Sequence, residues 1–208
     1  MKWIKANAHV LRFLLLFFMM TSFVVLSTNK PTIYIIGDST VRNTNRPQCG
    51  WGEMIGEFFD STQISISNQA MAGRSTRTFI KEKRWEKVLS TLTEGDYVFI
   101  QFGHNDEVPT KKTSTTPEQF KANLKKFVTQ TRERKAVPVL LTSMARRKFD
   151  STGKIVVTHD EYIKITRAVA KEENVVLFDM DIITQQLYQQ FGPDNSALLF
   201  MQLKPGEH

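Results

Sequence analysis

Short apolar runs alternate with longer amphipathic segments along the chain after Pro31. Most of the apolar runs are continuous, which is typical of strands covered on both faces of a sheet. The run at residues 63–67 instead alternates apolar and polar positions, so we expect it at a sheet edge. The predicted strands are Thr32–Ile36, Gln63–Ser67, Tyr97–Phe102, Val137–Thr142 and Val175–Asp179.

The amphipathic segments between these runs predict helices. The helix from Pro117 has a well-marked start, because Thr116 can cap it and Gln119 follows three residues later. Thr158 and Glu161 have the same spacing before a later helix. Alternating strands and helices without internal repeats predict one three-layer α/β/α domain around a parallel sheet of about five strands. The predicted helices are Gly52–Phe59, Phe79–Leu92, Pro117–Lys135, His159–Glu173 and Asp181–Phe191, the last ending at Gly192-Pro193.

The N-terminus has the layout of an export signal. A basic stretch from Met1 to Arg12 precedes an apolar run, Phe13–Leu26, and a polar segment follows. The pattern predicts a secretory signal peptide over residues 1–28 with cleavage near Ser27, and a mature domain over residues 29–208. A retained anchor and a core helix are the alternatives. We expect a periplasmic, cell-surface or extracellular protein with no membrane attachment after signal removal.

Composition narrows the classes of protein to which the chain can belong. With 41% hydrophobic and 24% charged residues, the chain has the make-up of an ordinary globular domain. The net charge of +7 falls to +4 without the three cations of the predicted signal, which suits an acidic polysaccharide or a nucleic acid. Neither G-x-G-x-x-G nor a P-loop follows the first strand, which argues against a nucleotide-binding or nucleic-acid-binding protein. The single Cys49 excludes an internal disulfide and a cysteine-rich metal site.

Unusual residues follow three of the predicted strands. Ser39 lies in Gly37-Asp38-Ser39-Thr40, Gly73 in the segment Asn68–Ser75, and Asn105 in Gly103-His104-Asn105-Asp106. The carboxyl ends of parallel strands meet at one edge of a sheet. A serine hydroxyl, a bare glycine N–H and an amide N–H meeting there form what acyl transfer needs, a nucleophile and oxyanion donors. Each motif alone is also typical of a strand-end turn, so the prediction depends on their combination.

In these motifs the chain resembles the SGNH (GDSL) hydrolases, and among them the rhamnogalacturonan acetylesterase-like carbohydrate esterases. The resemblance implies a flavodoxin-like α/β/α fold and ester hydrolysis without a metal or cofactor. It further implies that Ser39 is the nucleophile, and that its N–H, Gly73 and Asn105 form the oxyanion hole. The implied substrate is an acetylated pectic polysaccharide. The matching segments are Ile36–Val41, Gly50–Glu53, Asn68–Ser75 and Phe102–Asp106, with further similarity at Arg146–Phe149 and at His159 and Tyr162.

The family's Asp-x-x-His motif, which supplies the general base and the acid that orients it, is absent from this sequence. None of His9, His104, His159 and His208 has an acidic residue three positions before it. We expect His159 at the surface, at a helix start. We also expect that the sequence stops before this motif and before a final helix. The 208-residue chain alone should then be nearly inactive, and poorly stable because an apolar sheet face would be uncovered.

Trp51 and Arg74, with Arg77 nearby, are the candidate substrate-binding residues, because they suit sugar rings and uronate carboxylates. Equally, the tryptophan can belong to the core and the arginines to a solvated face. Two alternatives to a pectic acetylesterase stay open. The first is a broader acyl-esterase or lysophospholipase with the same motifs. The second is a non-catalytic carbohydrate-binding pseudoenzyme.

Overall fold

The computed structural model describes residues 30–200 of the chain. The predicted signal peptide over residues 1–28, with its cleavage near Ser27, lies outside the described residues, as do His9 and His208. The elements described below all belong to a unit that begins at Pro31.

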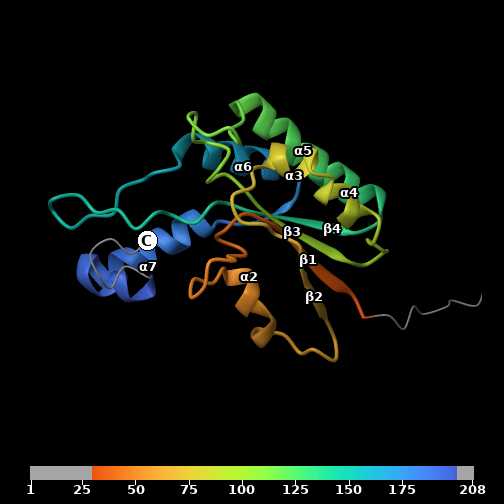
Figure 1. The fold of residues 1–208 in the computed structure, drawn as a ribbon, viewed down its shortest axis with the longest axis horizontal. Coiled ribbons are helices and arrows are strands. Elements are labelled where there is room, and N and C mark those ends of the chain that lie inside the picture. The colour runs from red at the N-terminus through yellow and green to blue at the C-terminus, as the bar shows by residue number, and fades with distance from the viewer. Residues whose placement is uncertain (1–29, 201–208) are drawn as a thin grey trace, which may run out of the picture. The chain divides into compact units, whose positions relative to one another are not determined.

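A five-stranded parallel sheet forms the centre of this unit (Figure 1). Neighbouring strands follow the order β2-β1-β3-β4-β5, and every pair is parallel. The prediction of a parallel α/β sheet is therefore confirmed, and β2 lies at an edge, as its alternating pattern predicted. The order reverses between β1 and β3, which is where ligands bind in flavodoxin-like sheets. The strands are β1 (Thr32–Gly37), β2 (Ser65–Asn68), β3 (Tyr97–Gln101), β4 (Val137–Leu141) and β5 (Val176–Phe178).

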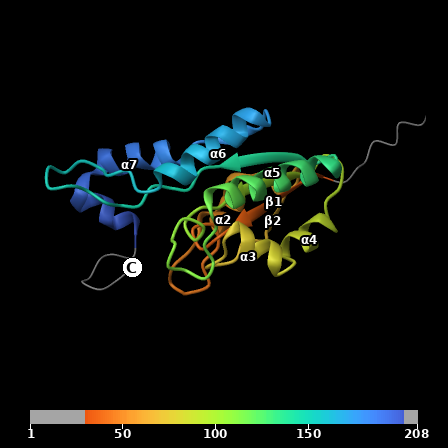
Figure 2. The same ribbon diagram turned by 90° about the horizontal axis from the view of Figure 1, so that it is seen from above.

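Helices cover the two faces of the sheet unequally. Four helices cover one face: α3 (Thr76–Lys81), α4 (Arg84–Leu89), α5 (Pro117–Glu133) and α6 (Asp160–Glu172). Among the described residues, only α2 (Trp51–Met54) and the 3-10 helix η1 (Ile55–Phe58) pack on the other. Figures 1 and 2 both show α7 (Met180–Asn195), which leads into η2 (Ser196–Leu199), beyond the carboxyl ends of the strands. Within residues 30–200, no helix is long and apolar enough to cross a bilayer.

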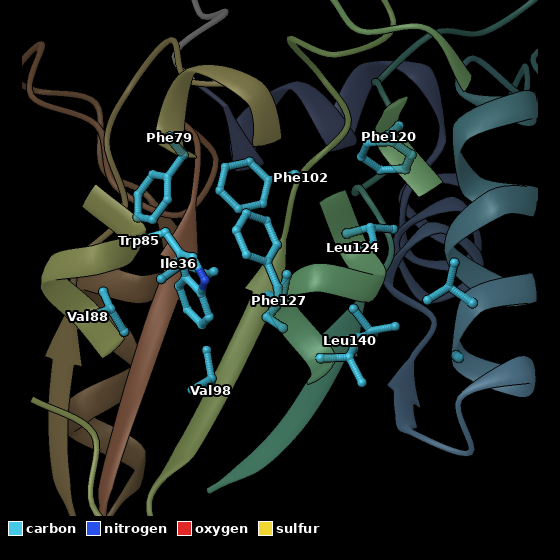
Figure 3. Close-up of a cluster of buried hydrophobic side chains, with 14 of the residues drawn as sticks. Ile36, Phe79, Trp85, Val88, Val98, Phe102, Phe120, Leu124, Phe127 and Leu140 are labelled. Atoms are coloured by element: carbon cyan, nitrogen blue, oxygen red, sulfur yellow. The ribbon is translucent and has the colours of Figure 1, made fainter. Parts of the chain in front are cut away.

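The larger core lies under the four helices and is rich in aromatic rings (Figure 3). Phe102, which follows β3, packs on Phe79 of α3 and Phe127 of α5, with ring centroids 5.4 and 5.8 Å apart. Trp85 of α4 meets Phe127 edge-to-face at 4.9 Å. Such pairs add to the stabilisation from apolar burial. This face therefore anchors β3, whose carboxyl end carries one of the candidate motifs.

The opposite face has a smaller core and an open region. Apolar side chains stay exposed on β5 and on the first turns of α7: Val176 (57%), Phe178 (45%), Ile182 (46%) and Ile183 (49%). We call these four residues the open strip. Parallel sheets are normally covered on both faces, so the open strip is an unusual surface within the described part of the chain. That the chain alone is poorly stable stays a prediction.

The prediction of one helix at Phe79–Leu92 is wrong. The segment forms two helices, because Lys83 adopts a left-handed backbone conformation with φ of 58° between α3 and α4. The first of them starts earlier than predicted, at Thr76, because Ser75 and Thr78 cap its first turn reciprocally.

The ends of the remaining helices follow the sequence signals to different degrees. Thr116 and Gln119 form the capping box predicted for α5. The box predicted from Thr158 and Glu161 is wrong, since His159 occupies the cap position of α6 without capping it by its side chain. In α7 the helical backbone breaks at Gly192, as the sequence predicted, but a further turn follows the break.

Candidate active site

Gly37 ends β1 where no side chain fits. A Cβ atom there would lie 2.5 Å from Val41 Cγ2 and 2.6 Å from the carbonyl oxygen of Gln101. The φ of Gly37 is not in the left-handed region, so this glycine serves close packing. Because Gly37 has no side chain, the end of β1 lies close to the end of β3, just before the turn that carries Ser39.

Ser39 lies in a turn held by the residues on either side of it. Asp38 Oδ1 accepts hydrogen bonds from the N–H and the hydroxyl of Thr40, both at 2.9 Å. The Thr40 hydroxyl also lies 3.3 Å from Gln101 Oε1, which accepts the indole N–H of Trp51 at 2.6 Å. Ser39 itself is half-buried. These bonds fix the turn and leave the serine partly accessible at the carboxyl edge of the sheet.

Gly73 lies in the loop after β2, next to the turn that carries Ser39. The loop joins that turn through Met71, whose N–H donates to the carbonyl of Gly37 at 3.0 Å. Gly73 has φ of +75°, which favours glycine, and nothing lies within 4 Å of the position that its Cβ would take. The backbone at Gly73 is therefore open to a ligand on that side.

The loops after β2 and β3 are joined by buried hydrogen bonds. Asn105 Nδ2 donates to the carbonyl of Arg74 at 3.1 Å. Asp106 accepts the N–H of Thr76 at 3.1 Å and its hydroxyl at 2.6 Å, and the hydroxyl of Thr115 at 3.1 Å. Together with the Met71 contact, these bonds bring the loops of all three predicted catalytic residues to one edge. That Ser39, Gly73 and Asn105 act catalytically stays a prediction.

Burial changes the protonation of three groups at this edge. Burial raises the pKa of Asp38 to about 6, although the two hydrogen bonds from Thr40 lower it in part. Burial likewise raises the pKa of Asp106 to about 6, against the bonds that it accepts from Thr76. The pKa of His104 is lowered to about 3, mainly by burial and to a smaller extent by the neighbouring His159. At neutral pH His104 is therefore uncharged, because desolvation opposes the charged form.

His159 is buried, so its expected surface position is wrong. Only 2% of the residue is exposed, and its Nδ1 lies 2.6 Å from a carboxylate oxygen of Glu107. The other oxygen of Glu107 pairs with Arg146 at 2.7 Å. The rings of His159 and His104 meet edge-to-face, with centroids 4.5 Å apart. The prediction failed because residues typical of a helix start do not indicate whether the side chain at the cap position points to solvent or into the protein.

A pocket of about 440 Å³ opens beside the Ser39 turn. Thr40 and His104 line it, and the loop of residues 142–159 after β4 contributes most of the other lining residues. That loop lies beside α7 in both ribbon views (Figures 1 and 2), and Arg147 ties it there by donating to Ser196 Oγ at 2.9 Å. The lining residues are Thr40, His104, Met144, Ala145, Arg146, Arg147, Lys148, Tyr188 and Phe200.

The predicted substrate-binding residues have internal partners. The indole N–H of Trp51 is bonded to a buried glutamine, as described above. The Arg74 guanidinium pairs with Glu82 at 3.0 Å, and Arg77 donates to the carbonyl of Lys112. None of the three lines the pocket. Their part in sugar binding stays a prediction, and Arg146, Arg147 and Lys148 are the cationic side chains that line the pocket instead.

The sequence interpretation also missed Asp106 and the pair of Glu107 with His159. Asp106 had an available signal, since it follows Asn105 directly within the third motif. The pairing of Glu107 with His159 joins residues 52 positions apart, which no local pattern reveals. Within residues 30–200, no group of three or more His, Cys, Asp or Glu residues is placed to hold a metal ion. The expectation of metal-free and cofactor-free chemistry stays a prediction.

The sequence that carries these motifs matches a known protein family and known relatives. The model of the GDSL-like Lipase/Acylhydrolase family matches residues 35–205. RhgT, a rhamnogalacturonan acetylesterase from Bacillus subtilis (strain 168), is 40% identical over 181 residues, which cover 85% of this chain and 76% of RhgT.

Solved structures show the same fold. YxiM from Bacillus subtilis superposes with a TM-score of 0.76 at 30% identity, covering 83% of this chain and 50% of YxiM. The chain therefore spans half of the YxiM chain. Axe2, an acetylxylan esterase from Geobacillus stearothermophilus, superposes with a TM-score of 0.59 at 19% identity, covering 76% of this chain and 79% of Axe2. At that identity the likeness supports the fold alone.

Proposed function

The chain belongs to the GDSL-like lipase/acylhydrolase family, and from this premise we propose that it removes O-acetyl groups from pectic polysaccharide. Ser39 is the proposed nucleophile, and the backbone N–H groups of Ser39 and Gly73 form the oxyanion hole with the Asn105 amide. The similarity to RhgT supports the acetyl group and the pectic substrate. One structural observation carries the proposal, namely the hydrogen bonds that join the three loops at the switch point of the sheet.

The proposed reaction uses two acyl transfers. The Ser39 hydroxyl oxygen bonds to the acetyl carbonyl carbon while its proton passes to a general base, and the negative charge moves to the carbonyl oxygen. The N–H donors stabilise that oxygen where the charge develops. The tetrahedral intermediate then collapses, the bond from the acetyl carbon to the sugar oxygen breaks, and that oxygen takes the proton from the base and leaves as a hydroxyl. Water hydrolyses the acetyl-serine in the same way and gives acetate.

The mechanism needs a general base, and the 208 residues lack the Asp-x-x-His motif that supplies it in the family. We propose that an Asp-x-x-His pair encoded after His208 provides the base and its orienting carboxylate. The 208-residue chain should then release acetate at no more than a trace rate, from the oxyanion donors alone. A longer product that carries such a motif should be faster by several orders of magnitude. Equal rates for the two chains would contradict this part of the proposal.

The pocket supports an acidic polysaccharide as the substrate. Lys148 is exposed on the pocket wall, and within residues 30–200 its ammonium makes no ion pair with a carboxylate. Arg146 lies next to it, although Glu107 partly neutralises its charge. A uronate unit next to the acetylated sugar would place its carboxylate near these cations, which favours pectic chains over neutral ones.

A broader acyl-esterase is the second candidate, because part of the pocket wall is apolar. Met144, Tyr188 and Phe200 could hold a longer acyl chain. Rates on acetyl, butyryl and octanoyl esters of one alcohol separate the two functions. Acetyl preference supports the pectic acetylesterase, whereas a rate that rises with chain length supports the broader enzyme.

Acetate release from acetylated rhamnogalacturonan by the full-length gene product tests the proposed function. We expect turnover that Ser39→Ala reduces by at least about 10⁴-fold, as for other serine hydrolases. Ser61→Ala is the matched control, because Ser61 is exposed in the loop before β2, at the other edge of the sheet. Retention on the acetylated polymer without acetate release would instead support the carbohydrate-binding pseudoenzyme.

We propose in addition that the protein is exported. The basic and apolar pattern of residues 1–28 supports an export signal. N-terminal sequencing of the protein outside the cytoplasmic membrane should give a start near Ser27. A product that keeps Met1 and sediments with membranes would favour the retained anchor.

A further inference from the structure

The Asn105 amide is held from both ends by neighbouring groups. Its Nδ2 donates one N–H to the carbonyl of Arg74 at 3.1 Å, and its Oδ1 accepts from the ammonium of Lys111 at 3.0 Å. Asn105 is 6% exposed, so water has little access to compete for these bonds. An amide has two N–H groups, and the carbonyl of Arg74 occupies one. The second N–H is the one that can reach an acyl oxygen.

Lys111 reaches this amide because the loop after β3 folds back on itself. The N–H of Thr115 donates to the carbonyl of Asp106 at 3.0 Å and closes the loop. Inside it, the N–H of Lys111 donates to the carbonyl of Val108 at 3.0 Å. The backbone of Lys111 is therefore fixed near Asn105, although its side chain is long and the residue is exposed.

The Lys111 ammonium has no carboxylate partner within residues 30–200, so its charge is not neutralised by an ion pair there. The charge acts at the proposed active site. Burial raises the pKa of Asp38, next to Ser39, and Lys111 is among the weaker influences that lower it. An unpaired cation that donates to an oxyanion donor from behind has an electrostatic role as well as a structural one.

We propose that Lys111 is a positioning residue for the reaction put forward above. Its bond to Oδ1 keeps the Asn105 amide from rotating, since a rotated amide would present its oxygen to the oxyanion and repel it. The ammonium also draws electron density from the amide, so the free N–H becomes a stronger donor. Both effects act on the transition state, where the carbonyl oxygen is charged, more than on the bound ester. The inference depends on the proposed function and adds a residue to it.

The test replaces Lys111 and measures kcat and KM separately on acetylated rhamnogalacturonan, with the full-length gene product. We expect Lys111→Met to lower kcat about 10-fold with KM within about twofold, as for a coupled pair of contacting residues. Lys111→Arg should restore most of kcat because it keeps a charged donor. Lys112→Met is the matched control, since Lys112 is the next residue of the same loop and is likewise an exposed lysine. In the Asn105→Ala background, Lys111→Met should have no further effect on kcat.

The result that overturns the inference is a Lys111→Met enzyme with wild-type kcat, or one whose loss persists undiminished in the Asn105→Ala background. A wild-type enzyme that releases no acetate overturns the proposed function itself. In that case the Asn105 side-chain amide resonances, which need no substrate, decide the contact separately. They should shift and exchange faster in Lys111→Met than in Lys112→Met, and unchanged resonances would overturn the inference.

Discussion

The loops after β2 and β3 and the long loop after β4 border the same rim of the sheet but are held in different ways. The first two loops share buried bonds, with Asp106 accepting from Thr76 and Thr115. The first residues of the loop after β4 also share buried bonds, such as that from Ser143 Oγ to the carbonyl of Phe102. Its outer part, residues 146–158, is held by side chains nearer the surface, such as Arg146 on Glu107 and Arg147 on Ser196. The first region carries the proposed oxyanion donors, and the second carries much of the pocket wall.

The two regions suit different tasks, namely stabilising the oxyanion and contacting the polymer. Donors for a developing charge act best when they are already in place, because reorganisation during the reaction would cost part of their benefit. A wall that contacts a polymer can tolerate movement, since each of its contacts contributes little. We therefore expect changes in the joined loops to lower kcat and stability, and changes in the loop after β4 to alter KM.

The largest expected effect is on catalysis. Asn105→Ala should lower kcat by about 10²–10³-fold, the usual loss for one oxyanion donor. Thr158→Ala, in the loop after β4, should change kcat by less than about twofold, because its hydroxyl accepts only a 3.4 Å contact from Arg146. Steady-state kinetics on acetylated rhamnogalacturonan measures both. Similar losses in the two variants would remove the contrast between the regions.

Stability should show the same contrast. Asp106→Ala leaves the N–H of Thr76 and the hydroxyl of Thr115 without their buried acceptor, and should cost about 3 kcal/mol of unfolding free energy. Arg147→Ala should cost about 1 kcal/mol or less, because its bonds lie near the surface. Urea unfolding gives both values. If the arginine variant loses as much as the aspartate variant, the loop after β4 is not the more weakly held region.

The pH dependence of stability tests the burial of Asp38. Its pKa is about 6 in the folded chain against the ordinary 3.8, so between these values the folded state keeps a proton that the unfolded state has lost. Wild-type stability therefore falls through this group as pH rises from about 4 to about 6. Asp38→Asn lacks the effect, and its stability relative to wild type should rise by about 2–3 kcal/mol between pH 4 and pH 7.

His104, whose pKa is lowered to about 3, acts in the opposite direction in both proteins and cancels in that difference. Urea unfolding at several pH values supplies the measurement. A difference that stays flat from pH 4 to pH 7 would mean that Asp38 is not desolvated in the folded chain.

The smallest expected effect is on substrate affinity. Lys148→Gln should raise KM for acetylated rhamnogalacturonan by about two- to fivefold and leave kcat unchanged, as for a single exposed charge. Lys154→Gln is the control, since Lys154 is exposed on the same loop but does not line the pocket. A small neutral acetyl ester should be hydrolysed alike by all three proteins. An equal KM change on the neutral ester would contradict recognition of a carboxylate.

The sequence predicted the sheet well because its signals are local. Each apolar run formed a strand within about two residues of its predicted bounds, and the polar spacing in Gln63–Ser67 marked the edge. The break at Lys83 was not predictable in the same way. Its left-handed backbone joins two helices whose apolar residues, including Phe79 and Trp85, share one core and imitate a single amphipathic run.

The candidate site shows the same difference between local signals, which the sequence carries, and contacts between segments, which it does not. Motifs directly after strands located Ser39, Gly73 and Asn105 at one edge, because strand order and direction follow from the α/β pattern. Contacts between distant segments were not predicted, such as the bond from Thr76 to Asp106, which lies 30 residues away. The burial of His159 escaped as well, since it depends on a partner 52 residues away.

The open strip on β5 and α7 has a consequence for the behaviour of the chain in solution. The four apolar side chains of the open strip are each about half exposed, so this surface favours self-association. Salts that are excluded from protein surfaces strengthen such apolar association. Kosmotropic precipitants such as ammonium sulfate should therefore cause self-association at lower concentrations for the wild-type chain than for a Phe178→Ser, Ile183→Ser variant. Mild detergent or low ionic strength would be the appropriate conditions for keeping it dispersed.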